Sequence, residues 1–141
     1  MVESPFPRPR WALAAALFAV IFGIATLIVG GLPLFGGAER RASAGAIVPF
    51  VLWFNFTAGF AYIAAGVGLF LWKRWAAVLA AAIAIASLAV FAAFGVHVAR
   101  GGAFEMRTVV AMTTRCAVWI VIAFASCRAL GCRHPARDVR R

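Results

Sequence analysis

Residues 105–119, EMRTVVAMTTRCAVW, open the last long apolar segment of the chain and place Arg115 well inside it. The other apolar segments of that length carry almost no charge. An arginine at the centre of a bilayer costs about 2.5–3.5 kcal/mol on insertion scales. Arg115 therefore requires a favourable environment, and the main question that the sequence raises is what this side chain faces.

Composition places the chain in a membrane. It has 141 residues, of which 65% are hydrophobic and 13% charged, and its mean hydropathy is +0.99. Soluble domains contain roughly 45–50% apolar and about 25% charged residues. Apolar runs of 18 or more residues predict membrane-spanning helices, and this chain has four. We expect one domain of the all-α class, an integral membrane antiparallel four-helix bundle with left-handed packing. The expected spans are residues 11–32, 47–72, 75–99 and 106–126, with tails at 1–10 and 128–141.

Prolines and glycines set the expected ends of these spans. Three prolines in residues 1–10 predict an extended lead-in, and Pro33 is expected to end the first span. Residues 36–45 are expected to form a loop, while Pro49 is tolerated in the first turn of the second span. The competing interpretation is a signal peptide cleaved after Ala44. The first apolar run is too long for the 7–15 residues of such a segment, so we favour a retained helix.

Small residues recur at four-residue spacing on the second span, as Ala61 with Ala65 and Ala64 with Gly68. In lipid, where packing replaces the hydrophobic effect between helices, such spacing lets two backbones approach closely. We therefore expect close helix contacts at these positions.

Basic residues are distributed unequally between the two sides of the expected membrane. One side holds nine lysines and arginines and the other four, with Arg115 left inside. Because positive charge stays cytoplasmic, we expect both termini in the cytoplasm and the protein in the cell inner membrane. Trp11, Trp72 and Trp75 then share the cytoplasmic interface. The nine are Arg8, Arg10, Lys73, Arg74, Arg128, Arg133, Arg137, Arg140 and Arg141, and the four are Arg40, Arg41, Arg100 and Arg107.

The net charge of +10 is therefore expected to attract the basic ends of the protein to anionic lipids at the cytoplasmic face. No nucleic-acid recognition motif accompanies it, so we expect no nucleic acid as a partner. The three cysteines, Cys116, Cys127 and Cys132, are expected to be free thiols, since an odd count makes no disulfide framework. A metal clip of Cys127, Cys132 and His134 lacks the paired spacing of zinc sites, and no metal is expected.

Two polar side chains are expected at the same depth in the bundle. Arg115 lies nine residues into the fourth span and Asn55 eight residues into the second, roughly 14 Å and 12 Å from the same surface. Thr57, Thr113 and Thr114 are close to that level. On the fourth span Thr108, Met112, Arg115 and Trp119 share one helical face, which we expect to point inward. Trp119 is a candidate cation–π partner for Arg115, and Trp53 and Tyr62 are candidates to line the same space.

Two interpretations of Arg115 stay open. In one it packs the bundle through hydrogen bonds to Asn55, threonine hydroxyls and backbone carbonyls. In the other it holds a quinone oxygen, a lipid phosphate or a carboxylate. No acidic residue occurs at this depth, so the chain itself offers no ion-pair partner.

A second polar cluster is expected at the opposite surface from the termini, where His97, Arg100, Glu105 and Arg107 surround two glycines. Helix dipoles alone account for His97 at a C-terminus and Glu105 at an N-terminus. Glu105 is also placed to pair with Arg100 or Arg107 in an exposed ion pair. The alternative is a metal-binding or proton-relay role for His97 with Glu105.

The stretch GFAYIAAGVGLFLWKRWAAVLAAAIA, residues 59–84, resembles the DoxX-like membrane proteins, in which a glycine-rich second helix leads through a short basic turn into an alanine-rich third helix. The resemblance implies a four-span fold and a redox or quinone-linked role. Members of that family often carry an acidic residue near the position of Asn55. The small multidrug transporters need a glutamate in the first helix, and residues 11–35 contain no acidic residue.

Three functions remain as expectations. The first is a non-enzymatic accessory or assembly partner of a membrane protein or of a second copy, with no cofactor. The second is a DoxX-like redox protein associated with a quinone or lipid, with Arg115, Asn55 and Trp119 at the head group. The third is a small carrier or channel with an intramembrane anion site. No Ser/His/Asp set, phosphate-binding glycine loop or carboxylate pair indicates an enzyme.

Overall fold

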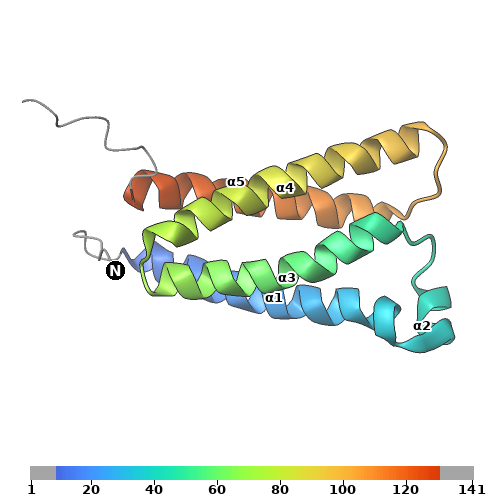
Figure 1. Cartoon of the computed structure of the whole chain (residues 1–141), viewed down its shortest axis with the longest axis horizontal. Helices are drawn as coiled ribbons and strands as arrows, with labels where there is room; N and C mark the ends of the chain where they lie inside the picture. Colours follow the sequence, from blue (N-terminus) through green and yellow to red (C-terminus); the bar gives the residue numbers. More distant parts are fainter. Residues whose placement is uncertain (1–8, 131–141) are drawn as a thin grey trace, which may run out of the picture.

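The computed structural model describes residues 9–130, and all of its regular structure in that part of the chain is helical. Four long helices follow the four apolar segments, and a short fifth helix joins the first two (Figure 1). The elements are α1 (Arg10–Phe35), α2 (Gly37–Ser43), α3 (Pro49–Phe70), α4 (Arg74–Ala99) and α5 (Met106–Leu130).

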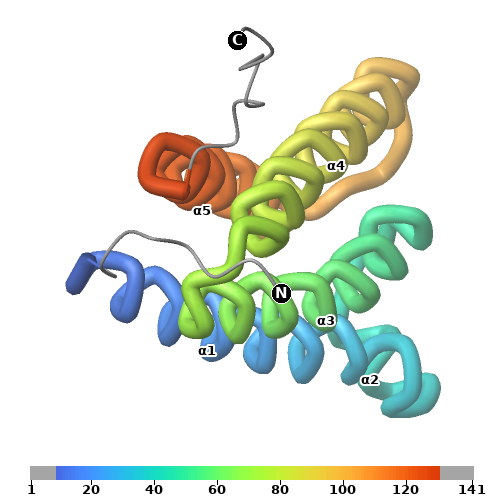
Figure 2. The backbone as a smooth tube through the Cα atoms, turned by 60° about the vertical axis from the view of Figure 1, so that its left-hand side comes forward, coloured from blue at the N-terminus to red at the C-terminus, as the bar shows by residue number. Residues whose placement is uncertain are grey.

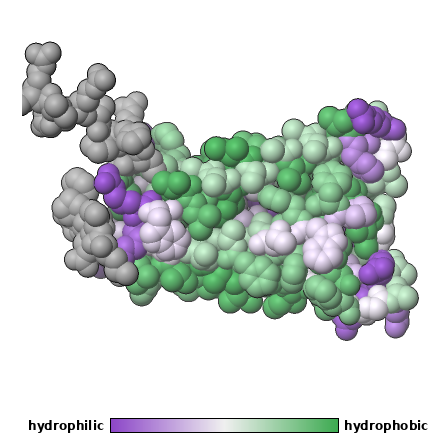
Figure 3. Space-filling model, in the orientation of Figure 1, coloured by the Kyte–Doolittle hydropathy of each residue, from purple (hydrophilic) through white to green (hydrophobic). Residues whose placement is uncertain are grey.

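The four long helices have 26, 22, 26 and 25 residues and are apolar enough to cross a membrane. About 20 residues of helix span the 30 Å hydrocarbon core of a bilayer. In the space-filling view, hydrophobic side chains form a broad belt between two hydrophilic ends (Figure 3). Length, composition and surface all fit a multi-pass membrane protein.

The expected boundaries need several corrections. α3 begins at Pro49 and ends at Phe70, inside the expected span of residues 47–72. Pro33 does not end the first helix, because α1 continues to Phe35 and is closed by the Gly36 N–H, which donates to the Leu32 carbonyl oxygen at 2.8 Å. Membrane helices tolerate proline where neighbouring elements satisfy the freed backbone groups. Residues 37–43, expected as a loop, form α2. α5 runs to Leu130, beyond the expected end of the last span at residue 126.

The turn between α3 and α4 is tight. Trp72 adopts a left-handed backbone conformation, with φ 54°, and the Lys73 N–H donates to the Gly68 carbonyl oxygen at 2.9 Å. This pattern closes a helix C-terminus and reverses the chain in few residues. The Trp72 ring is buried and meets the edge of the Trp11 ring at 6.0 Å, so the turn packs against the start of α1.

The helices pack as two pairs, α1 with α3 and α4 with α5, and contacts between α3 and α4 join the pairs. α1 and α5 make at most marginal backbone contact. The start of α1, the α3–α4 turn and the end of α5 lie at one end of the molecule, and α2 and the α4–α5 loop lie at the other (Figure 1). In a turned view the α4–α5 pair lies over the α1–α3 pair (Figure 2).

Glycine allows the closest contact, between α1 and α3. A Cβ atom added at Gly66 would lie 2.9 Å from the Ala16 carbonyl oxygen, and one at Gly23 would lie 2.9 Å from that of Gly59. The expected small-residue pairs are right only in part, since Ala65 and Gly68 are buried but Ala64 is exposed. A uniformly apolar helix gives no signal for which of its small residues faces a partner.

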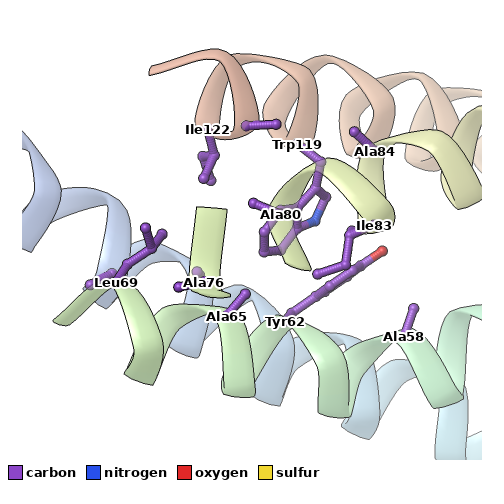
Figure 4. Packing of buried hydrophobic residues seen from close by; sticks show 13 residues of the cluster. Ala58, Tyr62, Ala65, Leu69, Ala76, Ala80, Ile83, Ala84, Trp119 and Ile122 are labelled. Carbon is purple, nitrogen blue, oxygen red and sulfur yellow. The ribbon is translucent and has the colours of Figure 1, made fainter. Parts of the chain in front are cut away.

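Rings fill the middle of the core. The Trp119 indole reaches from α5 to the Tyr62 ring of α3, with ring centroids 4.7 Å apart, and small side chains of α3 and α4 surround them (Figure 4). The ring of Phe22, from α1, stacks on the other side of Tyr62 at 5.6 Å. All four long helices therefore contribute to one core.

The expectation of three free thiols is wrong for Cys127, which is disulfide-bonded, and right for Cys116, which is free and buried. Cys132, His134 and most of the expected tails of residues 1–10 and 128–141 lie outside the described residues, which begin at residue 9 and end at residue 130.

Candidate functional site

A cavity of about 480 Å³ lies at the α2 end of the molecule, between α1, α3 and α5. Side chains of α2 and of the linker to α3 form its rim. Cavities of roughly 300–1,000 Å³ accommodate small-molecule ligands. The lining residues are Val29, Gly30, Leu32, Pro33, Arg40, Ser43, Ala44, Ala46, Ile47, Val48, Val51, Leu52, Asn55, Arg107, Thr108, Ala111 and Arg115.

Arg115 lines this cavity from α5 and is only 8% exposed. Its Nε and Nη1 atoms are buried and have no hydrogen-bond partner in the structure. The expected inward face of the helix is confirmed, since Met112, Arg115 and Trp119 are all buried. A buried cation with unpaired N–H groups is costly to maintain, and the cavity beside it is where an acceptor would lie.

Asn55 reaches the same cavity from α3, as the depth estimate predicts. Its Oδ1 atom is buried and also lacks a partner, and within residues 9–130 no hydrogen bond joins Asn55 to Arg115. The two polar groups therefore do not satisfy each other. Together they offer a ligand donors from the guanidinium and both a donor and an acceptor from the amide.

The charge of the lining is entirely positive. Among residues 9–130 the lining contributes three cations, Arg40, Arg107 and Arg115, and no carboxylate, and the Glu105 carboxylate at the mouth is hydrogen-bonded to the linker. Val48, which precedes α3, and Thr108, in the first turn of α5, also line it, so the cavity lies near two helix N-termini. Helix N-termini carry partial positive charge and unpaired N–H groups. The cavity is therefore built to attract an anion.

The rim is held by two contacts between α5 and the α2–α3 linker. The Glu105 carboxylate accepts a hydrogen bond from the Ala46 N–H at 3.1 Å, and the Arg107 guanidinium donates to the Ala44 carbonyl oxygen. Gly45, with φ +74°, packs against the same carboxylate. These contacts fix the linker beside the start of α5 and so shape the mouth of the cavity.

The ring closest to the guanidinium is Phe22, not Trp119. The Arg115 Cζ atom lies 6.0 Å from the centroid of the Phe22 ring. Trp119 and Tyr62 do not line the cavity, because both are fully buried in the core one layer below. Within residues 9–130 neither the Tyr62 hydroxyl nor the Trp119 N–H has a hydrogen-bond partner.

The other expected lining residues face away. Trp53 is 52% exposed and packs on Phe35 and Phe56 at the outer surface. The Thr57 hydroxyl donates to carbonyl oxygens of its own helix. Thr113 and Thr114 are exposed and donate to carbonyl oxygens one turn earlier in α5, so they do not hydrogen-bond Arg115.

The expected outer cluster divides into separate contacts. His97 Nε2 lies 3.3 Å from the Ala103 carbonyl oxygen, and the imidazole meets the Phe50 ring edge-on at 6.3 Å. Glu105 binds the linker, and Arg100 is exposed at the end of α4. Among residues 9–130 no group of three His, Cys, Asp or Glu side chains could hold a metal ion.

The sequence analysis did not assign Arg40, Ser43 or Phe22 to the site. Arg40 and Ser43 lie on α2, which was expected to be a loop, and Phe22 is one of many apolar residues on α1. The cluster of arginines in residues 36–45 was the available signal for the first two.

Comparison with known proteins gives no relative for this chain. No family model matches it, and neither a curated protein nor a solved structure matches it significantly.

Proposed function

We propose that this protein binds an anionic ligand in the cavity at Arg115. Asn55 lines the same cavity and orients the ligand, and Arg40 and Arg107 attract it at the rim. The observation that carries the proposal is the environment of Arg115, a guanidinium 92% buried, with two unpaired nitrogens, beside a cavity that no carboxylate lines. An anion there would neutralise the buried charge and satisfy its N–H groups.

The same proposal includes the membrane setting. We take the chain as an antiparallel four-helix bundle of the cell inner membrane with both termini cytoplasmic, supported by the nine-to-four distribution of basic residues. Trp11 and Trp72, in contact at one end, are the interfacial tryptophans of that arrangement. The cavity then opens towards the outer side of the membrane.

The two other functions would require a different environment for Arg115 or an open path through the bundle. An accessory protein in which Arg115 serves only packing would have that side chain bonded within the bundle, and its Nε and Nη1 are not. A carrier needs a path to both ends, whereas the packed Phe22, Tyr62 and Trp119 rings lie below the cavity. Lipid or quinone association, with or without redox chemistry, is compatible with the cavity.

Thermal unfolding of the purified full chain in detergent tests the proposal. The ligands are inorganic phosphate and short-chain phosphatidic acid, with sodium chloride at matched ionic strength and short-chain phosphatidylcholine as controls. A saturating ligand should raise the Tm by about 5–10 °C. The shift should vanish in Arg115→Leu and persist in Arg100→Leu, which removes an exposed arginine at the same end outside the cavity. Equal shifts in both variants would refute an Arg115 site.

A further inference from the structure

A second hollow runs along the seam between α1 and α5. It is a shallow groove of about 460 Å³ lined only by apolar side chains. Ala14, Ala15 and Phe18 line it from α1, and Ala117, Val121 and Ile122 line it from α5.

The groove exists because these two helices are not partners. α1 packs on α3 and α5 packs on α4, while α1 and α5 make at most marginal backbone contact. The alanines at positions 14, 15 and 117 are too small to close the space between them. An unfilled apolar groove forfeits dispersion contacts, and in a bilayer the available filler is an acyl chain.

The groove lies on the same two helices as the Arg115 cavity, further along α5 and nearer the start of α1. The cavity is lined by residues 29–33 of α1 and 107–115 of α5, and the groove by residues 14–18 and 117–122 of the same helices. Ala117 follows Arg115 by two residues, and Val121 lies roughly 9 Å further along the helix axis from Arg115. A tail that leaves a head group at Arg115 therefore passes the Phe22 ring, which lies against the guanidinium, and then meets the apolar groove along the seam.

The head group is defined by the charges around the cavity. Arg40, Arg107 and Arg115 contribute three cations, the described lining residues include no carboxylate, and the Glu105 carboxylate at the mouth already accepts the Ala46 N–H. A phosphate monoester offers several acceptor oxygens to such a set. A zwitterionic choline head group would bring its own cation against Arg40 and Arg107, and is disfavoured.

We infer that the ligand is an anionic phospholipid, with its phosphate in the Arg115 cavity and an acyl chain in the α1–α5 groove. This inference rests on the proposed function and specifies its ligand. The lipid enters sideways from the bilayer through the seam, so its tail never leaves an apolar environment. Because that transfer gains little hydrophobic free energy, the head group supplies the selectivity and the groove sets the orientation.

Photocrosslinking of the full chain in phosphatidylcholine vesicles tests this arrangement. One probe is phosphatidic acid with a diazirine on its acyl chain, and the other is phosphatidylcholine with the same chain. Peptide mass spectrometry compares labelling of the groove, residues 14–18 and 117–122, with labelling of the exposed face of α4 around Ala82 and Ile85. Phosphatidic acid should label the groove about tenfold more strongly than phosphatidylcholine does, relative to α4.

Two pairs of variants separate the head group from the tail. Arg115→Leu should reduce groove labelling to the α4 level, and Arg100→Leu should leave it unchanged. Ala117→Trp fills the groove at an exposed position and should also remove the preference, whereas Ala82→Trp, at an exposed position on α4, should not.

Equal labelling of groove and α4 by the phosphatidic acid probe would overturn the lipid inference. If inorganic phosphate still raised the Tm through Arg115, the proposed function would stand with a free anion as ligand. If phosphate and lipid both failed to raise the Tm, the anion site itself would be refuted.

Discussion

Replacing Arg115 with methionine removes the charge and keeps an unbranched side chain. In protein stripped of bound lipid, the structure predicts that this variant is more stable than the wild type. Placing a guanidinium at the expected mid-membrane depth costs about 2.5–3.5 kcal/mol, and buried nitrogens without hydrogen-bond partners account for part of that cost. Nε and Nη1 are two such groups.

Two effects reduce the gain. The contact between the Arg115 Cζ atom and the Phe22 ring, at 6.0 Å, is worth about 0.5–2 kcal/mol and is lost in the variant. The guanidinium also borders an open cavity, so part of its solvation is retained. The net expectation is that Arg115→Met stabilises the stripped protein by about 1–3 kcal/mol, and that saturating phosphatidic acid reverses the order.

The assay is reversible unfolding of stripped protein in mixed micelles with increasing denaturing detergent, followed by tryptophan fluorescence. Arg100→Met is the control, because Arg100 is exposed at the end of α4 and its loss should change stability by less than about 0.5 kcal/mol. If stripped Arg115→Met were less stable than the wild type by more than about 1 kcal/mol, the guanidinium would be a structural partner and the ligand argument would fail.

Three further predictions concern the contact between α1 and α3, the rim of the cavity and the Asn55 amide. Gly66→Ala should destabilise the protein by about 1–3 kcal/mol in the same unfolding assay, because the new methyl group would meet the α1 backbone. The control is Gly95→Ala, which has open space around it and should be neutral or up to about 1 kcal/mol more stable. Glu105→Ala should expose residues 44–48 to limited proteolysis, because the Ala46 N–H loses its acceptor, while Glu105→Gln keeps an acceptor and should resist. Asn55→Leu should weaken phosphate binding about two- to tenfold in the Tm titration without destabilising stripped protein, since Oδ1 has no protein partner; a loss of stability would show that the amide serves packing.

The spans could be predicted from the sequence because hydropathy and length determine them directly. The rotation of each helix about its own axis, which decides the residues that face the core, was harder to predict. On α5 the polar residues restrict the choice, and the inward face containing Met112, Arg115 and Trp119 is confirmed. On α3 nearly every residue is apolar, so Trp53 was expected inside and lies outside. Hydrophobicity cannot orient a helix whose whole circumference is apolar.

Each polar residue whose position was predicted wrongly, or not predicted at all, has a local reason for lying where it does. Thr57 satisfies its hydroxyl on carbonyl oxygens of its own helix, which lets a threonine face outward at no hydrogen-bond cost. α2 was missed because its seven residues, which begin at the second of two glycines, give too short a pattern to recognise, and the contribution of Arg40 to the cavity was missed with it. The rise per residue of a helix is constant, so the common depth of Asn55 and Arg115 could be predicted. The absence of a hydrogen bond between them could not.

The contrast between the two sides of α1 bears on why Arg115 is where it is. Towards α3 the chain uses glycine to bring backbones as close as sterics allow, at Gly23, Gly59 and Gly66. Towards α5 it leaves an open groove and a cavity with an unneutralised cation. A sequence that specifies one structure satisfies packing and polar groups together, and departures from that consistency concentrate at functional sites. Here the two departures are adjacent on the same pair of helices, and one amphiphilic anion would remove both.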